Sequence, residues 1–344
     1  MDFRHYLYAC CNFRRTKVIA HSKSDDPIQS LIHAGISALH SSRSAASFII
    51  ADFGSSHGRT SIQTMKSILE YLRQTNKFVG TPFVVHIDVP TNNWSKMFQL
   101  LINENPYYGY AMGRSFYEQC FPDKSISIGF SSAALHYLSR KPCHLAKHCY
   151  FRFATPTERK IFQKQSKFDL DAFLACRSRE LISGGILLLN IPCVGDNGDM
   201  DFDAHFDLIY QCAQLLSLLT SDELLHFTIP FYLRSLSECV DFELFHRHSL
   251  KLVKVEFVCL KSAVCNQYQH GHLTRDQYAR SLTMLMRPGT ELAFKQALQS
   301  NGRSSQDIED ISIQFWQLYE EKVKETIDER DLKTYATLLV LRKK

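Results

Sequence analysis

Short apolar runs alternate with segments of helical periodicity along this chain, and that alternation restricts the fold more than any other feature. Residues 47–53 (SFIIADF) form the first apolar run, which a cluster of glycine and serine ends. In the next segment, Ile62, Met65 and Leu69 recur at the spacing of an amphipathic helix. Because a buried strand followed by a helix is the repeating unit of a parallel sheet, the pattern predicts an α/β fold with helices on both faces.

The same pattern predicts further strands downstream. They cover residues 83–88 (FVVHID), 125–130 (SISIGF), 186–191 (ILLLNI), 252–258 (LVKVEFV) and 335–341 (YATLLVL). A helix is predicted over residues 169–181, with the pair Gly184-Gly185 as its end.

Two long insertions interrupt the later strands. Residues 197–246 and 261–333 are mostly helical in pattern, and the segment FDLIYQCAQLLSLL is apolar almost all round, which predicts a buried helix. The predicted units are an N-terminal arm or lid at 1–30, a core of 31–196, 247–260 and 334–344, and a helical cap from both insertions. Ligands bind at the carboxyl ends of the strands in open α/β sheets, so we expect the cap to lie over that edge.

Charge, hydropathy and cysteine usage exclude several classes of protein. The net charge is +5, and its 40 basic residues are spread among 35 acidic ones, unlike the patch of a nucleic-acid binder. No apolar run is long enough for a membrane helix, and the first residues lack the pattern of a secretory signal. Eleven irregularly spaced cysteines are typical of reduced thiols. We therefore expect a cytoplasmic protein with no nucleic-acid or membrane partner.

Two Cys-His pairs are the candidate metal ligands. They are Cys143-His144 and His148-Cys149, and their spacing does not match a zinc finger. We predict no metal site.

The turn ADFGSSHGRT at residues 51–60 is the first segment that could carry chemistry. Gly54 and Gly58 would let the backbone approach a ligand, and the following helix start offers free N–H groups. The dinucleotide pattern G-x-G-x-x-G is absent, and Asp52 would repel a phosphate while favouring a cation such as a sulfonium that carries an ammonium group. The competing interpretation is a tight turn with a helix cap.

Asp88 closes the second predicted strand. A carboxylate at this place commonly accepts hydrogen bonds from a ribose diol. Its distance in sequence from Asp52 exceeds the dinucleotide spacing of about 20 residues, which argues against an NAD site. A turn-capping role is the alternative.

Residues 112–142 join an aromatic-rich turn to a strand and then to a serine-rich helix start. Adenine rings stack on such aromatic side chains, and serine hydroxyls can read their edges. His136 and Tyr137 would lie just past the strand, near the mouth of a pocket, or else belong to the core.

Together these segments resemble the SABATH family of S-adenosylmethionine-dependent carboxyl methyltransferases. The family motif ADLGCSSGPNT corresponds to ADFGSSHGRTS here, and the form ADYGSSQGRNS of the non-plant branch is nearer still. The motif ND-L-P-x-NDF matches residues 87–94, GSFY-x-x-x-FP matches 113–122, and SS-x-x-LHWLS-x-P matches 131–142. The segment FLACRSRELISGGILLLNIP also fits the family.

The resemblance implies a Rossmann-like class I methyltransferase sheet, S-adenosyl-L-methionine as cofactor and a small organic acid as acceptor. It assigns cofactor binding to Asp52, Gly54, Ser55 and Gly58 (methionine part), Asp88 (ribose), and Val89, Ser115 and Phe116 (adenine). It assigns His136, Tyr137 and Gln29 to orienting the acceptor. Family members are often homodimers.

Three departures from the family pattern bear on activity. Tyr137 stands where the family has Trp, Thr60 stands where it has Asn, and the N-terminal Y-x-x-x-S-x-x-Q segment is degraded, with Gln29 as its nearest match. An ionised carboxylate acceptor needs no general base, so positioning and desolvation would supply the rate. The alternative function is a ligand-binding or regulatory protein that has lost catalysis, and an NAD-linked oxidoreductase is disfavoured.

Overall fold

The structure is a computed structural model that describes residues 26–40, 48–104, 107–195, 198, 200–326 and 332–344. Through these residues runs one mixed sheet of seven strands in the order β3-β2-β1-β4-β5-β7-β6. The strands are β1 (Ile49–Phe53), β2 (Phe83–Asp88), β3 (Gly109–Gly113), β4 (Ile126–Ser132), β5 (Leu181–Cys193), β6 (Leu250–Lys261) and β7 (Lys333–Lys343). The first five pair in parallel, whereas β7 runs antiparallel to both β5 and β6.

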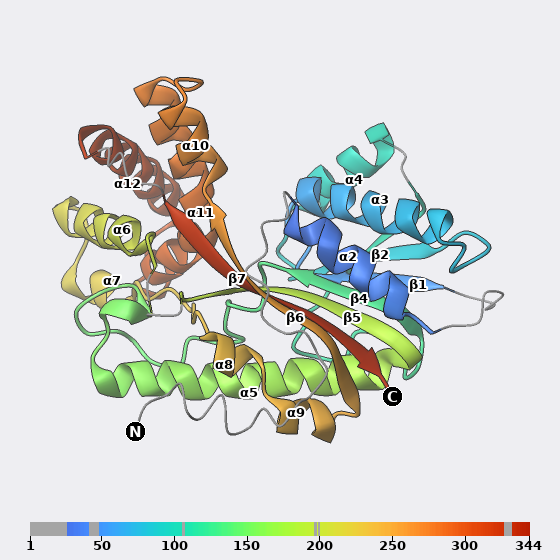
Figure 1. The fold of residues 1–344 in the computed structure, drawn as a ribbon. Helices are drawn as coiled ribbons and strands as arrows, with labels where there is room; N and C mark the ends of the chain where they lie inside the picture. The colour runs from blue at the N-terminus through green and yellow to red at the C-terminus, as the bar shows by residue number, and fades with distance from the viewer. Residues whose placement is uncertain (1–25, 41–47, 105–106, 196–197, 199, 327–331) are drawn as a thin grey trace.

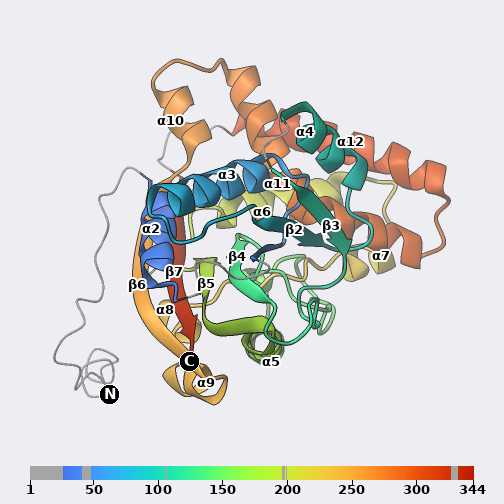
Figure 2. The same cartoon turned by 90° about the vertical axis from the view of Figure 1, so that its right-hand side faces the viewer.

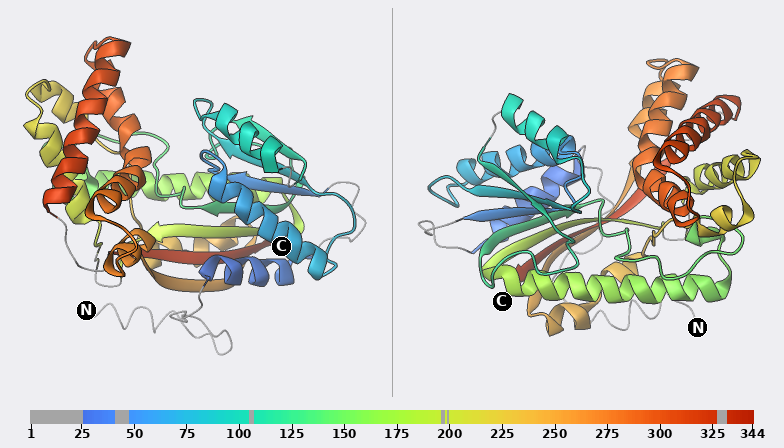
Figure 3. Two further views of the ribbon diagram at one scale, coloured as in Figure 1. Left: turned by 90° about the horizontal axis from the view of Figure 1, so that it is seen from above. Right: turned by 180° about the vertical axis from the view of Figure 1, so that it is seen from behind.

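Helices cover both faces of the sheet (Figure 1). One face carries α2 (Pro27–Ala38) and α3 (Arg59–Gln74), with α4 (Trp94–Glu104) beyond α3, and the other carries α5 (Pro156–Glu180), α8 (Leu236–Cys239) and α9 (Phe242–Arg247). Figure 2 shows α3 and α5 on opposite sides of β4 and β5. The remaining helices stand together at one end of the sheet (Figure 3). They are α6 (Asp203–Leu215), α7 (Ser221–His226), α10 (Ala263–Gln269), α11 (Arg275–Ser300) and α12 (Ser305–Glu325).

Alternation along β5 explains the two layers. Leu187 and Leu189 pack in the cluster that includes α5 and α9, while Ile186 and Leu188 pack with α2 and α3. All four side chains are fully buried, as expected for a strand with helices on both faces. The predicted α/β fold is confirmed.

The helix predicted at residues 169–181 has the right end within one residue, but its start and the capping role of Gly184-Gly185 are wrong. The helix α5 begins at Pro156, behind the capping box of Thr155 and Glu158, and ends at Glu180, where β5 starts directly. Gly184 therefore lies inside β5 and does not cap a helix. Its φ is +80°, and a Cβ there would overlap the backbone of His40. Close approach of another segment, not helix termination, requires this glycine.

The predicted boundary of the N-terminal arm is also wrong at its end. Asp26 caps α2 by accepting hydrogen bonds from the N–H groups of Ile28 (3.0 Å) and Gln29 (3.1 Å), so residues 27–30 are helical. Residues 1–25 lie outside the described part of the chain. The sequence pattern also missed β3, because the segment GYAMG is short and lies at the edge of the sheet.

The predicted cap needs two corrections. Side chains of α8 and α9, among them Cys239, Leu244 and Phe245, belong to the cluster under the sheet, so residues 236–247 are part of the core. The helix α6 buries Phe206 and Ile209, but Leu215 at its end is 61% exposed, so α6 is amphipathic and not buried all round.

In the described residues, no helix combines the length and apolar character needed to cross a membrane.

Candidate functional site

The turn after β1 is bound to the end of β2 through the backbone. The N–H groups of Gly54 (2.8 Å) and Ser55 (3.1 Å) both donate to the carbonyl oxygen of Ile87. Gly54 has a φ of +92°, and a Cβ on it would overlap the side chain of Ala134 and lie 3.6 Å from Phe116. Only glycine fits here, and the turns after β1, β3 and β4 meet at this point.

Asp88 stands at the end of β2 and binds two backbone N–H groups. Its Oδ2 accepts from Ser56 (2.7 Å) and its Oδ1 accepts from Val89 (2.8 Å). Burial raises the pKa of the Asp88 carboxyl, against the lowering effect of these hydrogen bonds. The neighbouring Val89 is 43% exposed, so its side chain is open to a ligand.

Asp52 is buried beneath the turn, only 2% exposed. Its Oδ2 accepts a hydrogen bond from Ser61 in the first turn of α3, and Ser61 also contacts His86 Nδ1 (2.8 Å). His86 is the register partner of Asp52 on β2 and is fully buried. Sequence reasoning missed His86, although a histidine within the apolar run FVVHID was a signal that could have found it.

The turn after β3 carries Phe116 beside the same edge. The Arg114 N–H donates to the Asp88 carbonyl (2.8 Å), which ties this turn to β2. From α5, the buried Arg177 donates to the Phe116 carbonyl (2.6 Å), and Glu180 accepts from the Cys120 N–H (2.5 Å). The Arg177–Glu180 pair was also missed from the sequence, because ion pairs at this spacing usually lie on an exposed helix face.

His136 and Tyr137 lie beyond β4, in an irregular segment rather than the predicted helix start, since the described residues 133–150 contain no α-helix. The Tyr137 carbonyl oxygen accepts a hydrogen bond from the Tyr117 hydroxyl (2.5 Å). The ring of Tyr137 packs edge-on against Phe231. Burial, with a smaller effect of the Asp88 charge, raises the pKa of Tyr137 to about 12. Tyr137 is therefore a protonated hydrogen-bond donor at neutral pH, and the charge of Asp88 contributes to its raised pKa.

Burial and the charge of Arg234 lower the pKa of His136 to about 3. The imidazole is therefore neutral at physiological pH. Its Nδ1 is buried and has no hydrogen-bond partner among the described residues. Such an atom is normally satisfied by protein, water or a ligand.

A contact from α11 completes this side of the site. A Cβ on Gly289 of α11 would lie 3.1 Å from the Tyr137 hydroxyl and 2.8 Å from Phe231. The described structure therefore brings α11 directly against the residue expected to face the acceptor.

Gln29 is not brought to this group by the contacts described. Its Nε2 donates to Ser67 Oγ (3.0 Å), well along α3 from the turn. Its proposed role toward the acceptor stays a prediction.

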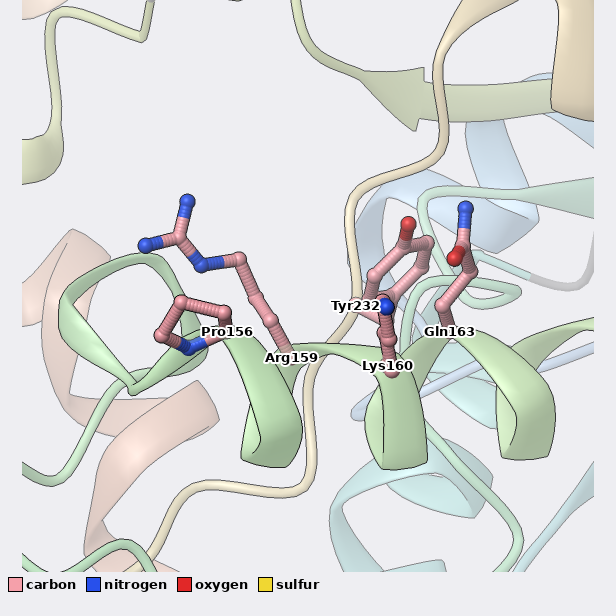
Figure 4. A pocket seen from close by; sticks show the side chains of 5 residues that line it. All are labelled: Pro156, Arg159, Lys160, Gln163 and Tyr232. Atoms are coloured by element: carbon pink, nitrogen blue, oxygen red, sulfur yellow. The ribbon is translucent and has the colours of Figure 1, made fainter.

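A separate pocket lies between the first turns of α5 and the segment that carries Tyr232 (Figure 4). Figure 4 shows Arg159 and Pro156 on one side, and Tyr232 beside Gln163 on the other, with Lys160 near Tyr232. None of the predicted site residues lines this pocket. In the described part of the chain, no group of three or more His, Cys, Asp or Glu side chains could hold a metal ion.

Comparisons with known proteins agree on one family. The family model described as SAM dependent carboxyl methyltransferase matches residues 19–344. Methyltransferase FUS9 of Gibberella moniliformis is 29% identical over 209 residues, which cover 55% of this chain and 54% of that protein. Farnesoic acid carboxyl-O-methyltransferase of Arabidopsis thaliana is 31% identical over 158 residues, which cover 42% of this chain and 45% of that protein. The chain thus matches about half the length of these curated relatives.

Among solved structures, a loganic acid methyltransferase with SAH superposes with a TM-score of 0.70 at 18% identity. The superposition covers 94% of this chain and 99% of that one. At this identity the likeness establishes the fold, which is that of a class I methyltransferase.

Proposed function

Because the chain belongs to the S-adenosylmethionine-dependent carboxyl methyltransferase family, we propose that it transfers a methyl group from S-adenosyl-L-methionine to the carboxylate of a small organic acid. The observation that carries the proposal is the convergence of three turns at one sheet edge. Ser56 N–H binds the Asp88 carboxylate at 2.7 Å, and the place of a Gly54 Cβ lies 3.6 Å from Phe116.

The residues at this edge fit the nucleoside part of the cofactor. Two backbone N–H groups fix the carboxylate of Asp88 at the strand end, where a ribose diol would donate hydrogen bonds to its oxygens. The exposed Val89 and the half-buried Phe116 offer apolar surface for adenine, with Ser115 beside them. Gly54, Ser55 and Gly58 would leave room for the methionine part, and Asp52 would contribute its negative charge below it.

The acceptor side fits a carboxylate that needs orientation rather than deprotonation. When bound, the cofactor would supply a methyl group on a positively charged sulfur: a bond from the carboxylate oxygen to the methyl carbon would form as the C–S bond breaks, and the sulfur would leave with the bonding electrons as a neutral thioether. The protonated Tyr137 would donate a hydrogen bond to the acceptor, and His136, neutral with an unpartnered Nδ1, would supply a second polar contact. Neither residue is required to act as a base, since a carboxylate is already ionised at neutral pH. Gln29 keeps its predicted orienting role as part of this proposal.

Relatives support an organic acid as acceptor. One curated relative is named for farnesoic acid, and another, from Catharanthus roseus, for loganic acid. A homodimer and a cytoplasmic location stay predictions. The location is supported by the nine described cysteines, all of which are free thiols.

Two measurements test the proposal. Calorimetric titration with S-adenosylhomocysteine should show a single tight site, and incubation with methyl-labelled cofactor and a panel of organic acids should yield a labelled ester. Cofactor binding without transfer to any acid would favour the alternative of a binding or regulatory protein. If neither S-adenosylhomocysteine nor the methyl-labelled cofactor bound, the proposal as a whole would be contradicted.

A further inference from the structure

A chain of four polar side chains crosses the core below the turn after β1. Tyr107 contacts His86 Nε2 through its hydroxyl (3.0 Å), His86 Nδ1 contacts Ser61 Oγ (2.8 Å), and Ser61 donates to Asp52. His86 is fully buried and Asp52 is 2% exposed. A buried polar chain of this kind is costly unless each member is satisfied, so its presence calls for a reason.

One set of hydrogen-bond directions satisfies this chain with an uncharged His86. Ser61 has one proton, which it gives to the Asp52 carboxylate, so its oxygen must accept from His86 Nδ1–H. The Nε2 atom of a neutral imidazole is then free to accept from the Tyr107 hydroxyl. With these directions the chain would run from Tyr107 to Asp52 through the Nδ1–H tautomer of His86, and this tautomer is part of the proposal made below.

With an uncharged His86, the negative charge of Asp52 has no compensating cation among the described residues. Among the described residues, His86 is the only basic side chain within ion-pair distance of the Asp52 carboxylate, at 3.5 Å, and it is neutral in this arrangement. The charge of Asp52 also reaches the site: burial is the main cause of the raised pKa of Asp88, and the Asp52 charge adds a smaller contribution in the same direction. A buried, unpaired carboxylate favours a cation placed beside it, since the interior screens charges weakly.

We propose that the Tyr107–His86–Ser61 chain makes the cofactor site selective for positive charge. His86 and Tyr107 are positioning residues: they hold Asp52 ionised and fixed below the Gly54 turn, so that the cationic methyl donor binds more tightly than the uncharged thioether that the reaction leaves. This inference rests on the proposed function. It adds a reason why the demethylated cofactor would leave the site and a new methyl donor would take its place.

A purely structural role for the same chain makes a different prediction. If it only stabilised β2 and the turn, its loss would weaken the binding of every nucleoside ligand by the same factor. Selectivity for charge is therefore the quantity to measure.

The test compares the affinities of sinefungin and S-adenosylhomocysteine by calorimetry. In sinefungin a protonated amine replaces the methylsulfonium, so the pair differs by one positive charge at the reacting position. The wild type should prefer sinefungin. In His86→Leu that preference should fall about tenfold, the size expected when a hydrogen bond serving a charged group is lost, and in Tyr107→Phe it should fall about threefold.

His33→Leu is the matched control, because His33 lies on the exposed side of α2 and stacks on Tyr71 far from the turn. It should leave both affinities unchanged. If His86→Leu does not fold, the milder Tyr107→Phe decides the question. In addition, the ¹⁵N resonances of the His86 imidazole should report the neutral Nδ1–H tautomer.

Equal weakening of both ligands in the two variants would overturn the proposal, as would an Nε2–H tautomer or an imidazolium at His86. Equal affinity of the wild type for both ligands would overturn it while leaving the proposed function intact. A wild type that binds neither ligand would contradict the proposed function, and the selectivity would fall with it.

Discussion

The two halves of the proposed site are built in different ways. In the cofactor half, the contacts run through the backbone: the N–H groups of Gly54 and Ser55 bind the Ile87 carbonyl, and that of Ser56 binds Asp88. In the acceptor half, side chains from distant segments meet by packing, as Tyr137 does with Phe231 and with Gly289 of α11. Backbone turns demand particular residues at fixed spacings, whereas packing tolerates many side chains. The cofactor half is therefore restricted in sequence, and the acceptor half is free to vary.

A methyl group at position 54 should break the cofactor half. Gly54→Ala places a Cβ at a φ of +92° and against Ala134, at a cost of about 1–2 kcal/mol for the backbone and about 1–3 kcal/mol for the overlap. We expect the affinity for S-adenosylhomocysteine to fall about 100-fold by calorimetry. Gly302→Ala is the control: its φ is +82°, but no atom lies within 4 Å of the added Cβ. Similar losses in both variants would show that backbone strain, and not the site, is responsible.

Removing the carboxylate of Asp88 should weaken the same half by a smaller amount. Asp88→Ala leaves two backbone N–H groups and the ribose diol without their acceptor, which should cost about 1–3 kcal/mol of cofactor binding. Titration with S-adenosylhomocysteine measures the change. An unchanged affinity would remove Asp88 from the site.

A methyl group at position 289 should affect only the acceptor half. In Gly289→Ala the new Cβ would press on Phe231 (2.8 Å) and on the Tyr137 hydroxyl (3.1 Å). We expect the KM for the acceptor acid to rise about tenfold, in line with a modest overpacking cost, while the affinity for S-adenosylhomocysteine is unchanged. A change in cofactor affinity alone would mean that the two halves are not separate in the way described here.

Tyr137→Phe removes one hydroxyl and should have a milder effect. If the hydroxyl donates to the acceptor carboxylate, its loss should weaken acceptor binding by about 0.5–1.5 kcal/mol. Steady-state kinetics with the best acid of the panel would measure this. An unaltered KM and kcat would exclude the donor role.

The smallest effect expected is that of pH near neutrality. The pKa of His136 is lowered to about 3, so the ring stays neutral above that value, and the pKa of Tyr137 is raised to about 12, so the phenol stays protonated below it. Between about pH 6 and 9, kcat/KM should therefore be level, because an acceptor carboxylate is ionised throughout. The acid side should be limited by Asp88, whose raised pKa means that its negative charge is lost sooner as the pH falls. A midpoint near 6.5 would contradict this expectation.

The sequence predicted the strands and the cofactor turns well because both depend on local patterns. The bounds of β2 match the predicted residues 83–88, and the turns that carry Gly54 and Phe116 lie beside the end of β2 at Asp88. The roles of these residues toward the cofactor stay predictions. Two of the failures share a cause, which is contact between distant segments. Gly184 is explained only by His40, and the buried His86 only by Asp52 and Tyr107. No periodicity in the sequence encodes such contacts.

The placement of β7 affects how the protein is made. Residues 333–343 form β7, which lies between β5 and β6 in the sheet. Leu339, for example, pairs with Leu189 of β5 on one side and with Val255 of β6 on the other. During synthesis β5 and β6 therefore leave the ribosome with a missing neighbour and with unpaired backbone groups along two long edges. Chaperone protection should matter most in that interval, and pairing across such long sequence separations is intrinsically slow.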